Sequence, residues 1–192
     1  MGRFRLRSQS QVIERCRVLR DELREALVRM PSSDPKVVDG VWSGEALGTL
    51  LWSLQLLELP PYDRPFDSGE VAAADPGRGQ LRDGDDVALE RESARLWHWR
   101  ARTTDLQAVG ELELPERYRS LDQLIAATAM RGHAQGLLPQ PIRGDFRAYG
   151  KVYRHLAADQ HAELLSIAVE RHHALNWLAG EGATWGDVPL DT

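Results

Sequence analysis

Residues 157–178 read AADQHAELLSIAVERHHALNWL, and this stretch decides the fold of the 192-residue chain. Steps of about 100° per residue gather its apolar side chains on one side of a helix. These side chains are Leu164, Ile167, Ala168, Ala174, Leu175 and Leu178. Gly180 follows at the place where a glycine in the left-handed conformation commonly closes a helix. The stretch therefore predicts a long helix that buries one side in the core.

Upstream of this stretch, the sequence predicts two more helices and a long loop. Residues 10–30 place apolar side chains at helical spacing, and Pro31 stops that helix. Residues 41–59 are apolar almost all round, which is typical of a helix in the centre of a core, and Pro60 follows them. The loop, near residues 60–84, is rich in proline, glycine and acidic residues. We expect it to run over the surface, with a mobile lid as the alternative.

The middle of the chain predicts two helices and two less regular segments. Helices are expected over residues 85–104 and 120–135, the second with Ser120 as its N-cap. Residues 106–114 are the one segment that could form a strand. Residues 146–155 could form a short helix that follows a break at two prolines.

The composition is ordinary for a globular protein, with 42% hydrophobic and 28% charged residues. Because no run of alternating residues is present, the expected fold class is all-α. We expect an irregular helical bundle of about five to seven helices that forms a single domain over residues 1–192. The formal net charge of −5 argues against a general nucleic-acid binder, so we interpret Arg3, Arg5 and Arg7 as a solvated tail.

The sequence favours a soluble, cytoplasmic protein. Residues 2–20 contain no apolar run of the kind found in a signal peptide. The longest apolar segment, residues 46–59, is too short and too interrupted to cross a bilayer. Cys16 is the only cysteine, which excludes an intrachain disulfide and a Cys-based zinc site and fits a reducing compartment. Its place on the inward side of its helix predicts an inert core residue.

Three charged residues, Glu45, Arg100 and Arg171, fall on helical faces that are otherwise apolar. Because an unpaired buried charge is costly, we expect Glu45 to bridge both arginines, with a carboxylate oxygen about 2.7–3.2 Å from a guanidinium nitrogen. One interpretation is an internal ion network that fixes the register of the helices. Another is a cleft in which the two arginines bind an anionic group while Glu45 orients them. Misjudged helical phases would instead leave all three residues exposed.

The sequence shows no complete metal or catalytic site. Glu170 and His173 have the Glu-x-x-His spacing that places two metal ligands on one helical face, but such sites need a second motif that the chain lacks. His172 and His173 are expected toward the polar side of their helix, as surface or capping groups. No phosphate loop, dinucleotide fingerprint or activated nucleophile is visible. We therefore expect neither a metal nor a cofactor.

Several blocks of the sequence are similar to one known family. The most specific block is ERHHALNWL, residues 170–178, which is followed by WGDV at residues 185–188. Further blocks are residues 7–16, 42–54, 99–100 and 144–146. Together they resemble a bacterial family catalogued as domain of unknown function 4272. The resemblance implies a soluble bacterial protein, implies no particular activity, and includes the three charged residues described above.

Two functions are compatible with these observations. We expect a non-catalytic binding or accessory protein, for example an immunity-type partner of another protein, with no nucleic-acid or membrane partner. The alternative is an enzyme or small-anion binder that uses a polar cluster. That candidate cluster consists of Glu45, Arg100, Arg171, His172, Asn176 and Trp177. An open pocket that reaches these groups would favour the alternative, and a dry, fully packed cluster would remove its basis.

Overall fold

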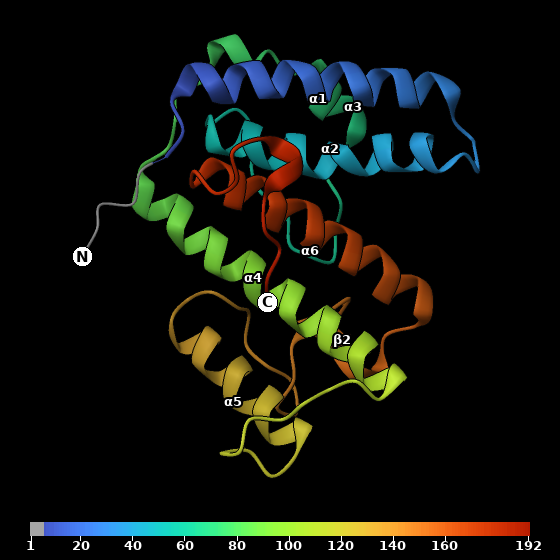
Figure 1. Cartoon of the computed structure of the whole chain (residues 1–192), viewed down its shortest axis with the longest axis vertical. Coiled ribbons are helices and arrows are strands. Elements are labelled where there is room, and N and C mark those ends of the chain that lie inside the picture. Colours follow the sequence, from blue (N-terminus) through green and yellow to red (C-terminus); the bar gives the residue numbers. More distant parts are fainter. Residues whose placement is uncertain (1–5) are drawn as a thin grey trace.

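The computed structural model describes residues 6–192, which form six α-helices, three short 3₁₀ helices and a two-stranded hairpin (Figure 1). The α-helices are α1 (Gln9–Arg29), α2 (Pro35–Ser53), α3 (Ser68–Ala73), α4 (Gly84–Val109), α5 (Leu121–Ala134) and α6 (Ala158–Leu178). The shorter elements are η1 (Pro76–Arg78), β1 (Arg147–Ala148), β2 (Lys151–Val152), η2 (Tyr153–His155) and η3 (Trp185–Asp187). The prediction of an all-α fold is confirmed. No helix within residues 6–192 is long and apolar enough to cross a membrane.

The helices are arranged in successive layers (Figure 1). The helices α1 and α2 run antiparallel side by side, α6 packs on α2, and α4 packs on α6. The helix α5 contacts α4 at the end of the molecule that is farthest from α1. The core contains residues of α1, α2, α4 and α6, with α2 and α6 in the central layers as their sequences predict.

The helix α6 has the extent and the buried side that its sequence predicts. All six apolar side chains expected to face the core are fully buried. Gly180 takes a φ of +85° and closes the helix. The N–H of Gly180 donates to the carbonyl of Trp177 (2.9 Å), and the N–H of Glu181 donates to the carbonyl of Asn176 (3.0 Å). These two bonds satisfy carbonyls that the helix end would otherwise leave unpaired.

The predicted limits of the second helix, residues 41–59, are wrong at both ends. The helix α2 begins at Pro35, a favoured first position for proline, and the side chain of Asp34 caps it. It ends at Ser53 because Gln55 takes a positive φ of +60°, which the helical conformation does not allow. Apolar residues continue beyond this point, so composition alone hides the end of the helix.

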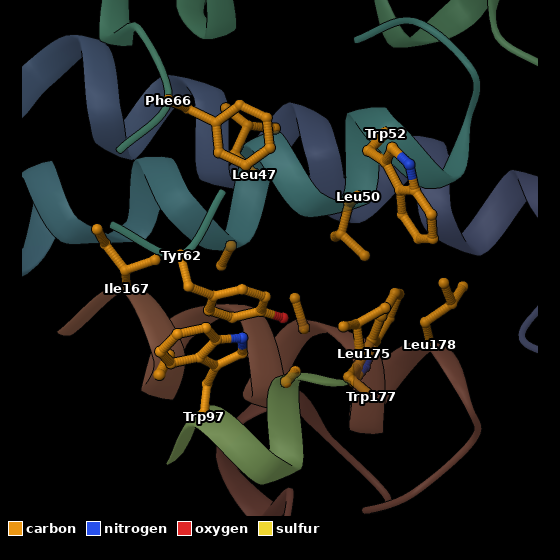
Figure 2. Close-up of a cluster of buried hydrophobic side chains, with 14 of the residues drawn as sticks. Leu47, Leu50, Trp52, Tyr62, Phe66, Trp97, Ile167, Leu175, Trp177 and Leu178 are labelled. Atoms are coloured by element: carbon orange, nitrogen blue, oxygen red, sulfur yellow. The ribbon is translucent and has the colours of Figure 1, made fainter. Parts of the chain in front are cut away.

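The segment predicted as a loop near residues 60–84 does not simply run over the surface. It contains α3 and η1, and it buries the side chains of Tyr62, Phe66 and Val71 in the core. Figure 2 shows Phe66 beside Leu47 of α2 and Tyr62 between α2 and α6. These three apolar residues are too few and too irregularly spaced to produce a helix or strand period, so their burial depends on tertiary packing.

Two smaller expectations are also wrong. Residues 106–109 continue α4, and Gly110, with a φ of +75°, closes that helix where a strand was expected. Residues 146–155 contain the hairpin and η2 instead of one short helix. Tyr149 (φ +51°) and Gly150 (φ +70°) form the tight turn between β1 and β2, because two successive positive φ angles match the twist of a hairpin.

The N-terminal part of the chain is tied to α6. Arg3 and Arg5 lie outside the described residues, but Arg7 is not the solvated residue that was expected. Its Nε donates to the carbonyl of Trp177 (2.7 Å), and its guanidinium carbon lies 4.6 Å from the centroid of that residue's ring. Cys16 is a buried core residue, as predicted, and burial raises the pKa of its thiol to about 12.

Candidate functional site

Glu45 on α2 and Arg171 on α6 form a buried ion pair. Nε and Nη2 of Arg171 both lie 3.0 Å from Oε2 of Glu45. The prediction that Glu45 lies within hydrogen-bond reach of a buried arginine is therefore confirmed. Arg171 is 0% exposed and Glu45 is 4% exposed, so the pair is shielded from water. Burial raises the pKa of Glu45, and the neighbouring Arg171 opposes that shift.

The remaining donors of Arg171 are taken up by the backbone. Its Nη1 donates to the carbonyl of Pro60 (2.7 Å), and its Nη2 donates to the carbonyl of Arg64 (3.0 Å). Each of the three guanidinium nitrogens thus has a partner within the protein. This is the dry, packed arrangement, and it leaves no nitrogen of Arg171 without a partner for an external anion.

Glu45 and Arg171 together act as a clamp on residues 60–66, which we call the clamped segment. The rings of Tyr62 and Phe66 lie 4.9 and 5.0 Å from the guanidinium carbon of Arg171, at cation–π distance. Oε1 of Glu45 accepts the backbone N–H of Phe66 (2.7 Å). The clamp therefore fixes an irregular piece of chain to two helices, through both its backbone and its aromatic rings.

Arg100 on α4 does not join the clamp, so the predicted bridge from Glu45 to Arg100 is wrong. Its Nε and Nη2 donate to the two carboxylate oxygens of Asp145 (2.8 and 3.0 Å), and its Nη1 donates to Oγ1 of Thr104 (2.6 Å). Its guanidinium carbon also lies 4.3 Å from the ring centroid of Tyr153. The physical reason is that α4 packs mainly on α6 and not on α2, which carries Glu45.

Asp145 is a central polar residue that sequence reasoning missed. It lies just before β1 and is 0% exposed. Besides the guanidinium of Arg100, Asp145 accepts the backbone N–H groups of Phe146 (2.8 Å) and Arg154 (3.2 Å) and the Nε–H of Arg154 (3.2 Å). Burial alone would raise the pKa of Asp145, but the hydrogen bonds from Arg100 and these N–H groups hold it below the usual value. The only signal in the sequence was its place in the family-like block at residues 144–146.

His172 and Asn176 belong to a second group of hydrogen-bonded polar side chains, which lies between α4 and α6. His172 is 2% exposed, so its expected place on the polar side is wrong, because α4 covers this side of α6. Nε of Arg91 can only donate, so the Asn176 atom that lies 2.6 Å from it is the amide oxygen, Oδ1. The amide nitrogen of Asn176 therefore faces Nε2 of His172, at 3.1 Å, and donates to it. His172 must then carry its proton on Nδ1 and donate it to Nδ1 of His98 (3.0 Å). Burial lowers the pKa of His172 to about 3.

Trp177 is a packing residue at the end of α6. Its ring lies 5.4 Å from that of Trp185, and His173 contacts the carbonyl of Trp185 through Nε2 (2.9 Å), so the C-terminal segment folds back onto the core. Glu170, which completes the Glu-x-x-His spacing with His173, has its pKa raised by burial to about 7. Within residues 6–192, no group of three His, Cys, Asp or Glu side chains is placed to hold a metal ion.

An open cavity of about 480 Å³ lies beside the clamped segment. It is lined by residues 59–63, by side chains of α4, and by Leu137, Pro139, Arg147 and Gly150. Its volume lies within the range of about 300–1,000 Å³ that is usual for small-molecule sites. Part of its wall is Tyr62, whose ring stacks on Trp97 at 5.4 Å (Figure 2). The ring of Tyr62 also contacts Arg171, so the clamp positions this wall of the cavity.

Glu90 is the polar wall residue that has unused hydrogen-bonding capacity. Its Oε1 accepts the hydroxyl of Tyr62 (2.9 Å), whereas its Oε2 accepts no hydrogen bond from residues 6–192. Burial raises the pKa of Glu90, although the hydrogen bond from Tyr62 and the charge of Arg171 oppose that shift. Neither residue was predicted, because nothing in the sequence brings together two residues that are 28 positions apart.

A second cavity of about 560 Å³ lies beside α1 and α2. Half of its lining residues are charged, and Arg29 among them is already paired with Asp34 (3.0 Å). It has no stacked aromatic pair in its wall, so the Tyr62–Glu90 cavity is the better candidate for a small-molecule site.

The comparisons with known proteins give no relatives for this chain. No family model, no curated protein and no solved structure matches it.

Proposed function

We propose that this chain is a non-catalytic binding protein whose ligand is a small molecule seated in the Tyr62–Glu90 cavity. The observation that carries the proposal is the unused Oε2 of Glu90 in the wall of a cavity of about 480 Å³. Because Glu90 lines the cavity, a ligand that donates to this oxygen would form a charge-assisted hydrogen bond there. The aromatic wall formed by Tyr62 and Trp97 offers the apolar contact that small-molecule sites commonly use.

The side chains best suited to catalysis, one cysteine and two histidines, do not line the cavity, which favours a binding role over a catalytic one. Cys16 lies in the core, where burial raises the pKa of its thiol to about 12, so a reactive thiolate is not expected. His98 and His172 contact each other between α4 and α6, and neither lines the cavity. A binding role needs no activated nucleophile or base.

The alternative, a small-anion binder built on the charged cluster, has less support. The guanidinium nitrogens of Arg171 are all occupied, and those of Arg100 contact Asp145 and Thr104. An anion would have to displace these internal partners. We also propose that the chain belongs to the bacterial family catalogued as domain of unknown function 4272 and that it is cytoplasmic. The family proposal rests on the sequence blocks, and the proposed location rests on the single cysteine.

A screen of chemically diverse small molecules by thermal unfolding tests the proposal. A ligand at one hundred times its Kd should stabilise the protein by about 2.7 kcal/mol and raise Tm by roughly 5–10 °C for a domain of this size. Pro139 lies at the exposed edge of the cavity, so Pro139→Trp should obstruct it and abolish the shift. The neighbouring Gln140→Trp, outside the lining, is the matched control and should leave the shift unchanged. If no compound gives a shift that Pro139→Trp removes, the proposal fails.

A further inference from the structure

The Tyr62–Glu90 cavity contains charged groups of both signs. Glu90 presents its unused Oε2, and Asp63 lies in the same wall, where its Oδ2 accepts the backbone N–H of Tyr149. Arg147 lines the cavity from β1, and its exposed side chain makes no ion pair with residues 6–192. Two carboxylates and one guanidinium give the cavity a net negative charge and one separate positive group.

The rest of the lining is mostly apolar. The apolar lining residues are Leu59, Pro60, Pro61, Trp97, Leu137 and Pro139. A ligand that fits this lining has an apolar body and carries its polar groups where the charged side chains are. A purely anionic ligand would meet two carboxylates, and a purely apolar ligand would displace water from the Glu90 carboxylate without forming a hydrogen bond in its place.

We infer, on the basis of the proposed function, that the cavity binds a small amphoteric molecule of the amino-acid type. A protonated amine donates to Oε2 of Glu90 in the neighbourhood of Asp63, and a carboxylate accepts from the guanidinium of Arg147. The apolar body of the ligand packs against the apolar lining. Arginine suits the second contact because its planar group binds a carboxylate through two parallel hydrogen bonds.

A matched set of probes at pH 7.5 tests this ligand class on the full chain by calorimetric titration. The set consists of phenylalanine, which has both charged groups, phenethylamine, which lacks the carboxylate, and 3-phenylpropionate, which lacks the amine. The twenty proteinogenic amino acids are titrated alongside to find the best-fitting body. We expect at least one amino acid to bind, and removal of either charged group from it to weaken binding about tenfold or more, the usual effect of losing a charged hydrogen bond.

Two variants assign the charged groups of the ligand to their partners. Glu90→Gln keeps an oxygen that can accept from Tyr62 but removes the charge, so it should weaken amino-acid binding about tenfold and weaken the carboxylate-only probe little. Arg147→Gln should have the opposite selectivity. Lys151→Gln removes a positive charge from the same hairpin but outside the cavity, and it should change neither affinity.

The possible outcomes separate this inference from the function on which it rests. If diverse compounds bind and Pro139→Trp blocks them, but no amino acid binds or Glu90→Gln has no effect, the ligand class is wrong and the binding function stands. If no compound of any class binds in the cavity, both proposals are wrong. Binding of an amino acid that depends on Glu90 and Arg147, but not on Lys151, supports both.

Discussion

The two buried arginines, Arg171 and Arg100, resemble each other in sequence context but are used in different parts of the molecule. Arg171 pairs with Glu45 on another helix and binds two carbonyls of the clamped segment. Arg100 pairs with Asp145, which comes from the turn before β1, and stacks on Tyr153. Each arginine attaches an irregular segment to a helix. Both buried charges therefore hold non-helical chain in place, and only the Glu45–Arg171 pair also links two helices.

The buried ion pair and the cavity beside it differ in their access to solvent. The Glu45–Arg171 pair is almost fully buried, whereas the ring of Tyr62, which touches the clamp, forms part of the wall of an open cavity. The buried charges therefore shape the candidate site without contacting its ligand. In this arrangement Arg171 is a positioning residue for Tyr62.

The largest effect is expected from breaking the clamp. Glu45→Gln should lower the free energy of unfolding by roughly 3–5 kcal/mol, because it leaves the fully buried Arg171 without its carboxylate. Urea unfolding measures the loss. The double change Glu45→Gln with Arg171→Met should lose less than the sum of the two single changes. A loss below about 1 kcal/mol for Glu45→Gln would show that the pair contributes little to stability.

An effect comparable to that of Glu45→Gln is expected at the second arginine. Asp145→Asn should lower the free energy of unfolding by roughly 3–5 kcal/mol, because it leaves the buried Arg100 without its carboxylate and also weakens the contact with Arg154. Amide hydrogen exchange should show the loss of protection concentrated in the hairpin, near residues 146–155, and not in the clamped segment. Equal loss in both regions would mean that the two arginines belong to one cooperative network.

The next effect is expected from the contact between His98 and His172, which is buried between α4 and α6. Unlike the two ion pairs, this contact is between neutral side chains. Burial lowers the pKa of His172 to about 3 in the folded chain, from the usual 6.5 of a histidine. Between these pH values the unfolded chain binds more protons than the folded chain, so the free energy of unfolding should fall as the pH falls from about 6.5 to about 3, by on the order of a few kcal/mol. Urea unfolding at a series of pH values measures this slope.

His172→Gln is the control for that slope. It removes the titrating ring, so the decrease in stability between pH 6.5 and pH 4 should become shallower than in the unchanged chain. An equal slope in both proteins would show that other groups cause the pH dependence.

The smallest effect is expected from a change that separates the clamp from the cavity. Tyr62→Phe keeps the ring on Arg171 and Trp97 but removes the hydroxyl that donates to Glu90. We expect a loss of about 0.5–1.5 kcal/mol in the free energy of unfolding, the usual value of one hydrogen bond. A loss as large as that of Glu45→Gln would contradict the view that the ring, and not the hydroxyl, is the part of Tyr62 held by the clamp.

Local chemistry in the sequence was sufficient for several elements of the fold. The extent of α6, its buried side and its end at Gly180 follow from helical spacing and from the left-handed conformation that glycine adopts easily. The same spacing showed that Glu45 and Arg171 needed partners, because an unpaired charge on a buried face is costly. These inferences depend only on residues within about one helix length of each other.

The choice of partners was decided by the tertiary structure. Which carboxylate each arginine meets depends on how α2, α4 and α6 cross, and Glu45 and Arg171 are 126 positions apart. Asp145 and Tyr62 lie in irregular segments, where no helical or strand period marks which side chains turn inward. The Tyr62–Glu90 cavity likewise exists only where four distant segments meet, so spacing along the chain could predict the buried charges but not the open site beside them.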